Sequence, residues 1–284
     1  VNLLPSDRPQ DVYQGVCALV ARRVAEEASV ELPPDAKELA VHDRNVARLA
    51  ASQVDRKLVK QTVMTSVYGV TFVGARQQMQ ARLRERCMAE GRVYLTSHYL
   101  ARLTMECIRE LFAEARDIMD WLAQLATLVA NEGQPMTWLT PIGLPVLQPY
   151  RRKGFFQVRT LLQSVQLKDN SDHYPVAANR QRSAFPPNFV HSLDSTHMLL
   201  TAVAMERQAL PFAAVHDSYW AHAGNVDAMN RTLRECFLEL YRRPVLEELH
   251  ASLRLRYPGV NFPPVPPRGT LPLEKVLESP YFFN

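Results

Sequence analysis

Apolar residues recur every three or four positions along the first half of the chain, which is the spacing of one face of an α-helix. Polar residues at Ser6–Asp7 and at Asp35 mark two predicted helix starts, and Gly133 marks the end of the last predicted helix. We therefore expect residues 1–135 to form a helical region. The pattern predicts helices over residues 6–28, 36–68, 74–90 and 93–131.

The pattern changes after residue 135, where prolines and glycines separate short apolar runs, as is typical of brief strands and tight turns. Residues 151–184 are predicted to form an extended basic β-hairpin or loop. Within this segment we expect a strand over 155–166 and a polar hairpin tip at 168–173.

A second predicted hairpin covers residues 212–223, where short apolar runs flank His216 and Asp217 and place a carboxylate at the tip. The helix before it is expected to be entered through an extended segment at 186–189.

The aromatic carboxy-terminal end is expected to dock on the protein, because an exposed apolar terminus is unfavourable. We therefore predict an α+β fold that is mainly α-helical, with a second region over 136–284. Its helices are predicted at 191–208, 226–256 and 273–279.

The composition is that of an ordinary globular protein, with 47% apolar and 22% charged residues among 284. The sequence has no run of about 18 apolar residues, so no membrane span and no membrane partner is expected. Its four cysteines are far apart, which argues for reduced thiols and against a zinc site. The first residues show no targeting character and no initiator Met, so we expect a mature or excised piece.

The stretch 56–69 carries the strongest local indication of a binding site. Four of its side chains are spaced four residues apart and would share one helix face, and Gly69 would end that helix. Two cations followed by a thioether and a phenol suit a nucleoside triphosphate, which is anionic at one end and flat at the other. The alternative is a solvated basic helix edge whose last two members lie in the core. The four residues are Arg56, Lys60, Met64 and Tyr68.

Three motifs, in this order, resemble those of one enzyme family. RKLVKQTVMTSVYG (56–69) resembles the fingers motif of single-subunit, phage-type DNA-directed RNA polymerases, and VHDSYW (215–220) resembles their second palm carboxylate motif. FPPNFVHSLDSTHMLLTA (185–202) resembles a segment between the two. The resemblance covers essentially the whole chain, and the sequence looks most similar to the mitochondrial members of this family. It implies right-hand polymerase fingers helices with a small antiparallel palm sheet, and transcription in the mitochondrial matrix or, alternatively, in a plastid.

The resemblance also implies roles for individual residues in nucleotidyl transfer. Asp217 would be a metal ligand, one of two aspartates that hold two Mg²⁺ ions. His216 would support the hairpin tip and the primer end. Arg56 and Lys60 would bind the triphosphate, and Lys60 would also be a candidate proton donor to pyrophosphate.

On the nucleoside side, the resemblance places Tyr68, beside Gly69, under the nascent base pair, where it would select a ribose 2′-hydroxyl together with His191. Met64, on the same helix face, is a further candidate for substrate binding. Segment 151–184 matches the region of the family's specificity hairpin, which reads promoter DNA or separates strands. The expected partners are the DNA template and promoter, nascent RNA, ribonucleoside triphosphates and, as candidates, transcription factors.

The first palm motif of the family, an aspartate followed by glycine, is absent from this sequence. A two-metal site with one carboxylate should hold its ions poorly, so we expect a polymerase fragment that is inactive alone. Asp194 is expected only to cap a helix start. Two alternatives remain open. One is an A-family DNA polymerase, which Ser218 after His-Asp disfavours, and the other is a non-catalytic nucleic-acid-binding module, which the missing aspartate motivates.

Overall fold

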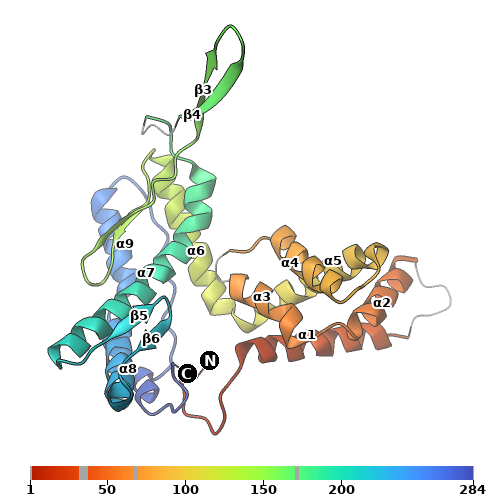
Figure 1. Ribbon diagram of the computed structural model, residues 1–284, viewed down its shortest axis with the longest axis horizontal. Coiled ribbons are helices and arrows are strands. Elements are labelled where there is room, and N and C mark those ends of the chain that lie inside the picture. The colour runs from red at the N-terminus through yellow and green to blue at the C-terminus, as the bar shows by residue number, and fades with distance from the viewer. Residues whose placement is uncertain (1, 32–37, 67–68, 170–172, 284) are drawn as a thin grey trace. The chain divides into compact units, whose positions relative to one another are not determined.

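The computed structural model describes residues 2–31, 38–66, 69–169 and 173–283, which divide into two compact units. The first unit holds the described residues from 10 to 116, and the second holds residues 2–9 and those from 117 onward. Helices dominate, and the strands pair as separate two-stranded antiparallel sheets (Figure 1). The predicted α+β, mainly α-helical class is confirmed. The predicted regions 1–135 and 136–284 stay a prediction.

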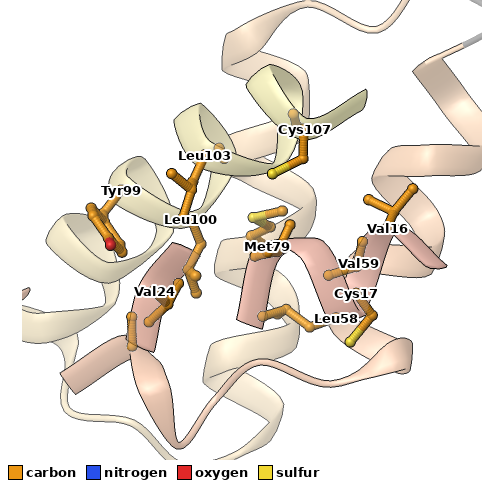
Figure 2. Packing of buried hydrophobic residues seen from close by; sticks show 14 of the residues in the cluster. Val16, Cys17, Val24, Leu58, Val59, Met79, Tyr99, Leu100, Leu103 and Cys107 are labelled. Atoms are coloured by element: carbon orange, nitrogen blue, oxygen red, sulfur yellow. The ribbon is translucent and has the colours of Figure 1, made fainter. Parts of the chain in front are cut away.

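Five helices build the first unit around one apolar core. All five contribute buried side chains, and Figure 2 shows how those of α1, α3, α4 and α5 meet in the centre. Because α1 contacts α2, α3 and α5, its position determines which residues lie beside α3. The helices are α1 (Val12–Ser29), α2 (Glu38–Ala51), α3 (Arg56–Ser66), α4 (Phe72–Glu85) and α5 (Glu90–Leu111).

The first helix begins later than the sequence predicts. The expected cap at Ser6–Asp7 is wrong, because α1 starts at Val12 and Asp11 caps it. A carboxylate oxygen of Asp11 accepts a hydrogen bond from the backbone N–H of Gln14 at 3.1 Å. Asp7 and Asp11 can both cap a helix, and the local sequence does not show after which of them the helical conformation begins.

Two of the long predicted helices are interrupted. The segment 36–68 forms α2 and α3, and Asp55 caps the second of these by accepting the N–H of Leu58 at 2.8 Å. The segment 93–131 is likewise interrupted, because Phe112 leaves the helical conformation between α5 and α6 (Ala113–Asn131). Apolar periodicity continues across both breaks, so the pattern alone did not reveal them. The predicted cap Asp35 lies outside the described residues.

The second unit packs helices and short hairpins around a separate core. At its centre the Trp138 ring lies 5.2 Å from Phe185 and 6.3 Å from Phe189, and its indole N–H donates to the Ser192 hydroxyl at 3.0 Å. The elements that follow α6 are β1 (Thr137–Leu139), β2 (Pro145–Leu147), β3 (Gly154–Arg159), β4 (Ser164–Asp169), α7 (Ala178–Arg207), β5 (Ala213–Val215), β6 (Ser218–Trp220), α8 (Val226–Arg242), α9 (Val245–Arg256) and two short 3₁₀-helices, η1 (Ala223–Asn225) and η2 (Leu273–Leu277).

Helix α7 contradicts the predicted extended entry at 186–189. The helix begins at Ala178 and continues through Pro186 and Pro187, although each proline removes a backbone donor. Phe185 and Phe189, on either side of the prolines, are both buried against Trp138. Tertiary packing therefore holds a helix that the local sequence disfavours.

Two further expectations for the second unit need correction. The basic hairpin forms, but the predicted strand 155–166 is interrupted by the turn between Arg159 and Ser164, which forms the tip in place of residues 168–173. The hairpin also ends before residue 184, because α7 begins at Ala178. The predicted helix 226–256 ends at Arg242 and resumes at Val245, because Pro244 cannot supply a helical N–H.

Three further predictions for this half are confirmed. The strands β1 and β2 pair as a brief hairpin, and residues 273–277 form the short helix η2. The carboxy-terminal end docks on the protein, since Phe282 is buried against Leu233 and Val276. Within the described residues, no helix is both long and apolar enough to span a membrane.

Candidate active site

Helix α3 separates its residues into a buried face and an exposed face. The buried residues are Leu58, Val59, Thr62 and Val63, which fill part of the first core. Arg56, Lys60 and Met64 are all exposed, so these three share the solvent side of the helix, as their spacing predicts. The alternative that places Met64 in the core is wrong, because 45% of its surface is exposed. Tyr68 lies outside the described residues.

Two residues from the start of α1 lie against the cations of α3. The Arg56 Nε donates to an oxygen of Asp11 at 2.6 Å. The Arg56 guanidinium carbon lies 5.4 Å from the ring centroid of Tyr13, and the Lys60 Nζ lies 5.7 Å from the same centroid. Sequence reasoning missed Asp11 and Tyr13, since they precede α3 by more than 40 positions and no local pattern connects them.

The ionisation of Asp11 reflects this contact. Partial burial alone would raise the pKa of the Asp11 carboxyl, but hydrogen bonds from Arg56 and from the Gln14 amide, with the charge of Arg56, lower it overall. Asp11 therefore stays ionised beside Arg56 at neutral pH. The end of α3 is also as predicted, because Gly69 has a φ of +72° and donates its N–H to the Ser66 carbonyl at 3.1 Å.

The predicted carboxylate turn is present in the second unit. Strands β5 and β6 pair Val215 with Ser218, so His216 and Asp217 form a two-residue turn. His216, Asp217 and Ser218 are all exposed, and the Asp217 carboxylate is accessible to a ligand. His216 has a φ of +54°, a conformation that costs a non-glycine residue on the order of 1 kcal/mol and persists where its surroundings impose it.

The inner side of this hairpin rests on aromatic side chains. Tyr219, two residues after Asp217, is half-buried between Phe212 at 5.3 Å and Phe283 at 4.6 Å between ring centroids. Burial and neighbouring negative charges raise the pKa of Tyr219 to about 12, so its hydroxyl keeps its proton at neutral pH. The hydroxyl lies 3.5 Å from Nδ1 of His197.

His197 connects this hairpin to two helices. It lies on α7, is buried, and its Nε2 lies 2.7 Å from the backbone carbonyl of Leu233 on α8. Desolvation lowers the pKa of His197, although the Leu233 carbonyl and Asp194 partly oppose this. The ring is therefore neutral at pH 7, with Nε2–H donating to Leu233 and Nδ1 facing the Tyr219 hydroxyl.

A second carboxylate lies within electrostatic range of Asp217. Asp194 is in the interior of α7, so the expectation that it caps a helix start is wrong. Desolvation raises the pKa of Asp194, His191 and His197 lower it in part, and the charge of Asp217 raises it further. Asp194 therefore senses the charge of Asp217, and it lies three residues after His191 on α7.

The basic hairpin β3–β4 exposes nearly all of its side chains, and Figure 1 shows it as an arm of the second unit. Arg159 and Lys168 are exposed cations on its two strands. The turn carries Leu161 and Leu162, whose side chains are fully exposed. This arm therefore combines positive charge with an apolar tip.

The residues present fit a divalent metal only in part. Asp217 offers exposed, hard carboxylate oxygens of the type that Mg²⁺ prefers. Among the described residues, however, no group of three or more His, Cys, Asp or Glu side chains could hold a metal ion. Asp217 could therefore supply one metal ligand, and the described residues place no further pair of such side chains beside it.

Comparison with known proteins identifies the family of this chain. The family model described as DNA-dependent RNA polymerase matches residues 1–260. The chain therefore belongs to the DNA-dependent RNA polymerase family. This membership contradicts the alternative of an A-family DNA polymerase.

Among its relatives, the DNA-directed RNA polymerase 1, mitochondrial, of Nicotiana sylvestris is 50% identical over the whole chain, which spans 28% of that protein. The DNA-directed RNA polymerase 2A of Nicotiana tabacum is 48% identical, and the chain spans 84% of it. The DNA-directed RNA polymerase 2, chloroplastic/mitochondrial, of Arabidopsis thaliana is 48% identical over the whole chain, which spans 28% of that protein. Most of these relatives are therefore much longer than this chain.

Proposed function

We propose that this chain supplies the fingers and part of the palm of a single-subunit RNA polymerase that copies DNA into RNA. The observation that carries the proposal is the exposed turn His216–Asp217 in a chain of this family. The exposed cations Arg56 and Lys60 support it, because two cations one helical turn apart suit a triphosphate. The proposed reaction is nucleotidyl transfer from ribonucleoside triphosphates.

In this proposal the residues of the second unit act on the primer end. Asp217 is one ligand for Mg²⁺, and two ions operate in the whole enzyme. Bound Mg²⁺ would lower the pKa of the primer 3′-hydroxyl and neutralise the departing pyrophosphate. His216 supports the turn beside the primer end, and His191 helps to recognise the ribose 2′-hydroxyl.

The residues of α3 act on the incoming nucleotide. Arg56 offers a guanidinium fork to the triphosphate, and Lys60 offers a point charge that can also donate a proton to pyrophosphate. Met64 extends the same face towards the base. Tyr68, beside Gly69, lies under the nascent base pair in the proposal and selects ribose.

The proposed partners follow from the family and from the charges of the arm. DNA template, promoter, nascent RNA and ribonucleoside triphosphates are the expected ligands, and transcription factors are candidates. Arg159 and Lys168 on the β3–β4 arm suit contacts with DNA phosphates. The proposed location is the mitochondrial matrix, with the plastid as the alternative, and the relatives' names, mitochondrial or chloroplastic/mitochondrial, support these two organelles.

Primer extension on an RNA–DNA scaffold with Mg²⁺ tests the proposal. This chain is compared with a longer one that restores the upstream palm segment containing an aspartate followed by glycine. Extension by the longer chain alone supports both the polymerase function and the need for a second carboxylate. Extension by the short chain shows that a residue of this chain supplies the second carboxylate, and Asp194 would be the first residue to substitute. If a full-length polymerase carrying this segment extends nothing, the non-catalytic nucleic-acid-binding module is favoured instead.

A further inference from the structure

We propose that Asp11 and Tyr13, at the start of α1, are positioning residues that hold Arg56 and Lys60 in the geometry needed to bind a nucleoside triphosphate. The inference rests on the proposed function, since it concerns the cations of that site. It adds two residues that no local motif in the sequence indicates.

Asp11 divides its two carboxylate oxygens between two tasks. Oδ1 accepts the backbone N–H of Gln14 at 3.1 Å and so fixes the side chain at the amino-terminal end of α1. Oδ2 accepts the Nε of Arg56 at 2.6 Å. Because Asp11 binds Nε, the two terminal nitrogens of the guanidinium can still bind phosphate as a fork. Asp11 thus orients Arg56 without occupying its phosphate-binding edge.

Tyr13 brings the two cations to one place. Its ring is half-buried and packs against the core of the first unit, so the ring has a fixed position. The Arg56 guanidinium lies 5.4 Å and the Lys60 ammonium 5.7 Å from its centroid, both within the range of attraction between a cation and a ring. Two like charges one helical turn apart repel each other. A shared aromatic ring offsets this repulsion and keeps both side chains from spreading into solvent.

A purely stabilising role explains this group poorly. The side chains of Arg56 and Asp11 are 44% and 35% exposed, and exposed ion pairs contribute about 0–1 kcal/mol to stability. The neighbouring pair of Asp55 and Arg86 at 2.6 Å has the same form, since Asp55 also caps a helix, but its cation is not one of those proposed to bind the triphosphate. The pair at Asp11 joins two separate helices and directs a cation of the proposed triphosphate site. Orientation is therefore the larger consequence of this contact.

The test measures RNA extension on a preassembled RNA–DNA scaffold as a function of ribonucleoside triphosphate concentration. It uses the full-length polymerase that contains this segment. Tyr13→Leu should raise the KM for the triphosphate about tenfold with a smaller change in kcat, because two cation–ring contacts are lost. Tyr13→Phe keeps the ring and should restore the KM. Asp11→Asn, which still caps α1, should raise the KM about threefold.

A second measurement tests the binding of phosphates without a nucleoside. Inhibition by inorganic tripolyphosphate should weaken in Tyr13→Leu and Asp11→Asn in parallel with the rise in KM. Two matched controls use the same kinds of contact elsewhere in the first unit. Glu90→Gln removes the exposed ion pair with Arg84, and Tyr94→Leu removes a ring under Arg76. Both controls should leave the KM and the tripolyphosphate inhibition unchanged.

The outcomes separate this inference from the proposed function. If Arg56→Ala and Lys60→Ala leave the KM unchanged, these cations do not bind the triphosphate and both proposals fail. If those variants raise the KM while Tyr13→Leu and Asp11→Asn do not, only the positioning inference fails. A lower KM in Asp11→Asn would also overturn it, since Asp11 would then compete with phosphate for Arg56. A kcat near that of the unmodified enzyme at saturating triphosphate shows that a variant is folded.

Discussion

The ring of Phe283, near the carboxy-terminal end of the chain, lies 4.6 Å from the ring of Tyr219, which follows the Asp217 turn by two residues. Phe283 also lies 5.9 Å from His197, and its φ of +59° is a conformation that non-glycine residues rarely adopt. The end of the chain thus packs behind the proposed catalytic turn. The adjoining segment is anchored by Arg234, whose guanidinium donates to the backbone carbonyls of Val276, Leu277 and Ser279.

From this packing we predict that Phe283→Ala lowers kcat by about two- to tenfold with little change in the triphosphate KM. An aromatic pair contributes about 0.5–1.5 kcal/mol, and its loss would leave the turn less well supported. Steady-state extension assays on the full-length polymerase measure the effect. Leu277→Ala, which truncates an exposed side chain of the same segment, is the control. Equal activity of Phe283→Ala and the unmodified enzyme would show that the end of the chain does not support the turn.

Asp217→Asn should abolish turnover in the full-length polymerase. The amide keeps the shape of the side chain but removes the negative charge that a divalent metal requires, and a metal contributes several kcal/mol to the transition state. We expect a loss of about 10³-fold or more in kcat. Asp227→Asn, an exposed carboxylate in the first turn of α8, is the matched control. Activity that survives Asp217→Asn would remove Asp217 from the metal site.

Tyr68→Phe should preserve RNA synthesis while weakening the choice of ribonucleotides over deoxyribonucleotides. The ring remains to support the base pair, and only the hydroxyl that recognises the 2′-hydroxyl is lost. Competition between ribo- and deoxyribonucleoside triphosphates in single-nucleotide extension measures the ratio of kcat/KM values. Tyr94→Phe removes the hydroxyl of an exposed tyrosine on α5 and should leave the ratio unchanged. Unaltered discrimination in Tyr68→Phe would count against this role.

The cations of the β3–β4 arm should contribute to DNA affinity through phosphate contacts. Each of Arg159→Gln and Lys168→Gln should weaken DNA binding and reduce the slope of log affinity against log salt by about one. Fluorescence anisotropy of a labelled duplex at several salt concentrations measures the slope. Arg254→Gln replaces an exposed arginine on α9 and provides the comparison. A slope that changes equally in Arg254→Gln would indicate nonspecific attraction rather than contacts made by the arm.

The stability of the chain should fall as the pH drops below about 6.5. The folded pKa of His197 is lower than its ordinary value of 6.5, so between the two values the unfolded chain binds more protons than the folded one. Stability therefore rises with pH through this window and is lost as the pH decreases. Asp194, whose pKa is raised, acts in the opposite sense.

A variant isolates the contribution of His197. Urea unfolding of the chain at pH 7.5 and pH 5.5 should show a smaller pH effect in His197→Gln than in the unmodified protein. His222→Gln, which replaces an exposed histidine before α8, is the control. An identical pH effect in all three proteins would mean that another group is responsible.

Much of the candidate site could be predicted from local sequence. The four-residue spacing of Arg56, Lys60 and Met64 places them on one helix face whatever that helix packs against. The two apolar runs around His216 and Asp217 are sufficient to predict a hairpin with a carboxylate at its turn. Both features depend on neighbours within a few residues, which is why the pattern predicts them well.

Element boundaries were less predictable for a physical reason. Apolar periodicity continues across the breaks at Asp55 and Phe112, so the pattern alone does not reveal where one helix ends and another begins. Conversely, Pro186 and Pro187 indicate an extended segment by local rules, whereas α7 passes through both. Burial of the flanking Phe185 against Trp138 decides the outcome there.

The sequence by itself determined the family, the mainly helical class, the cation face of α3 and the carboxylate turn, because each follows from short-range periodicity or from a contiguous motif. Only the tertiary structure decided that Asp11 and Tyr13 contact those cations, and that His197 and Phe283 contact Tyr219 beside the turn. These contacts join residues 22 or more positions apart. They arise from the burial of apolar faces, which brings distant segments together without leaving a local signal.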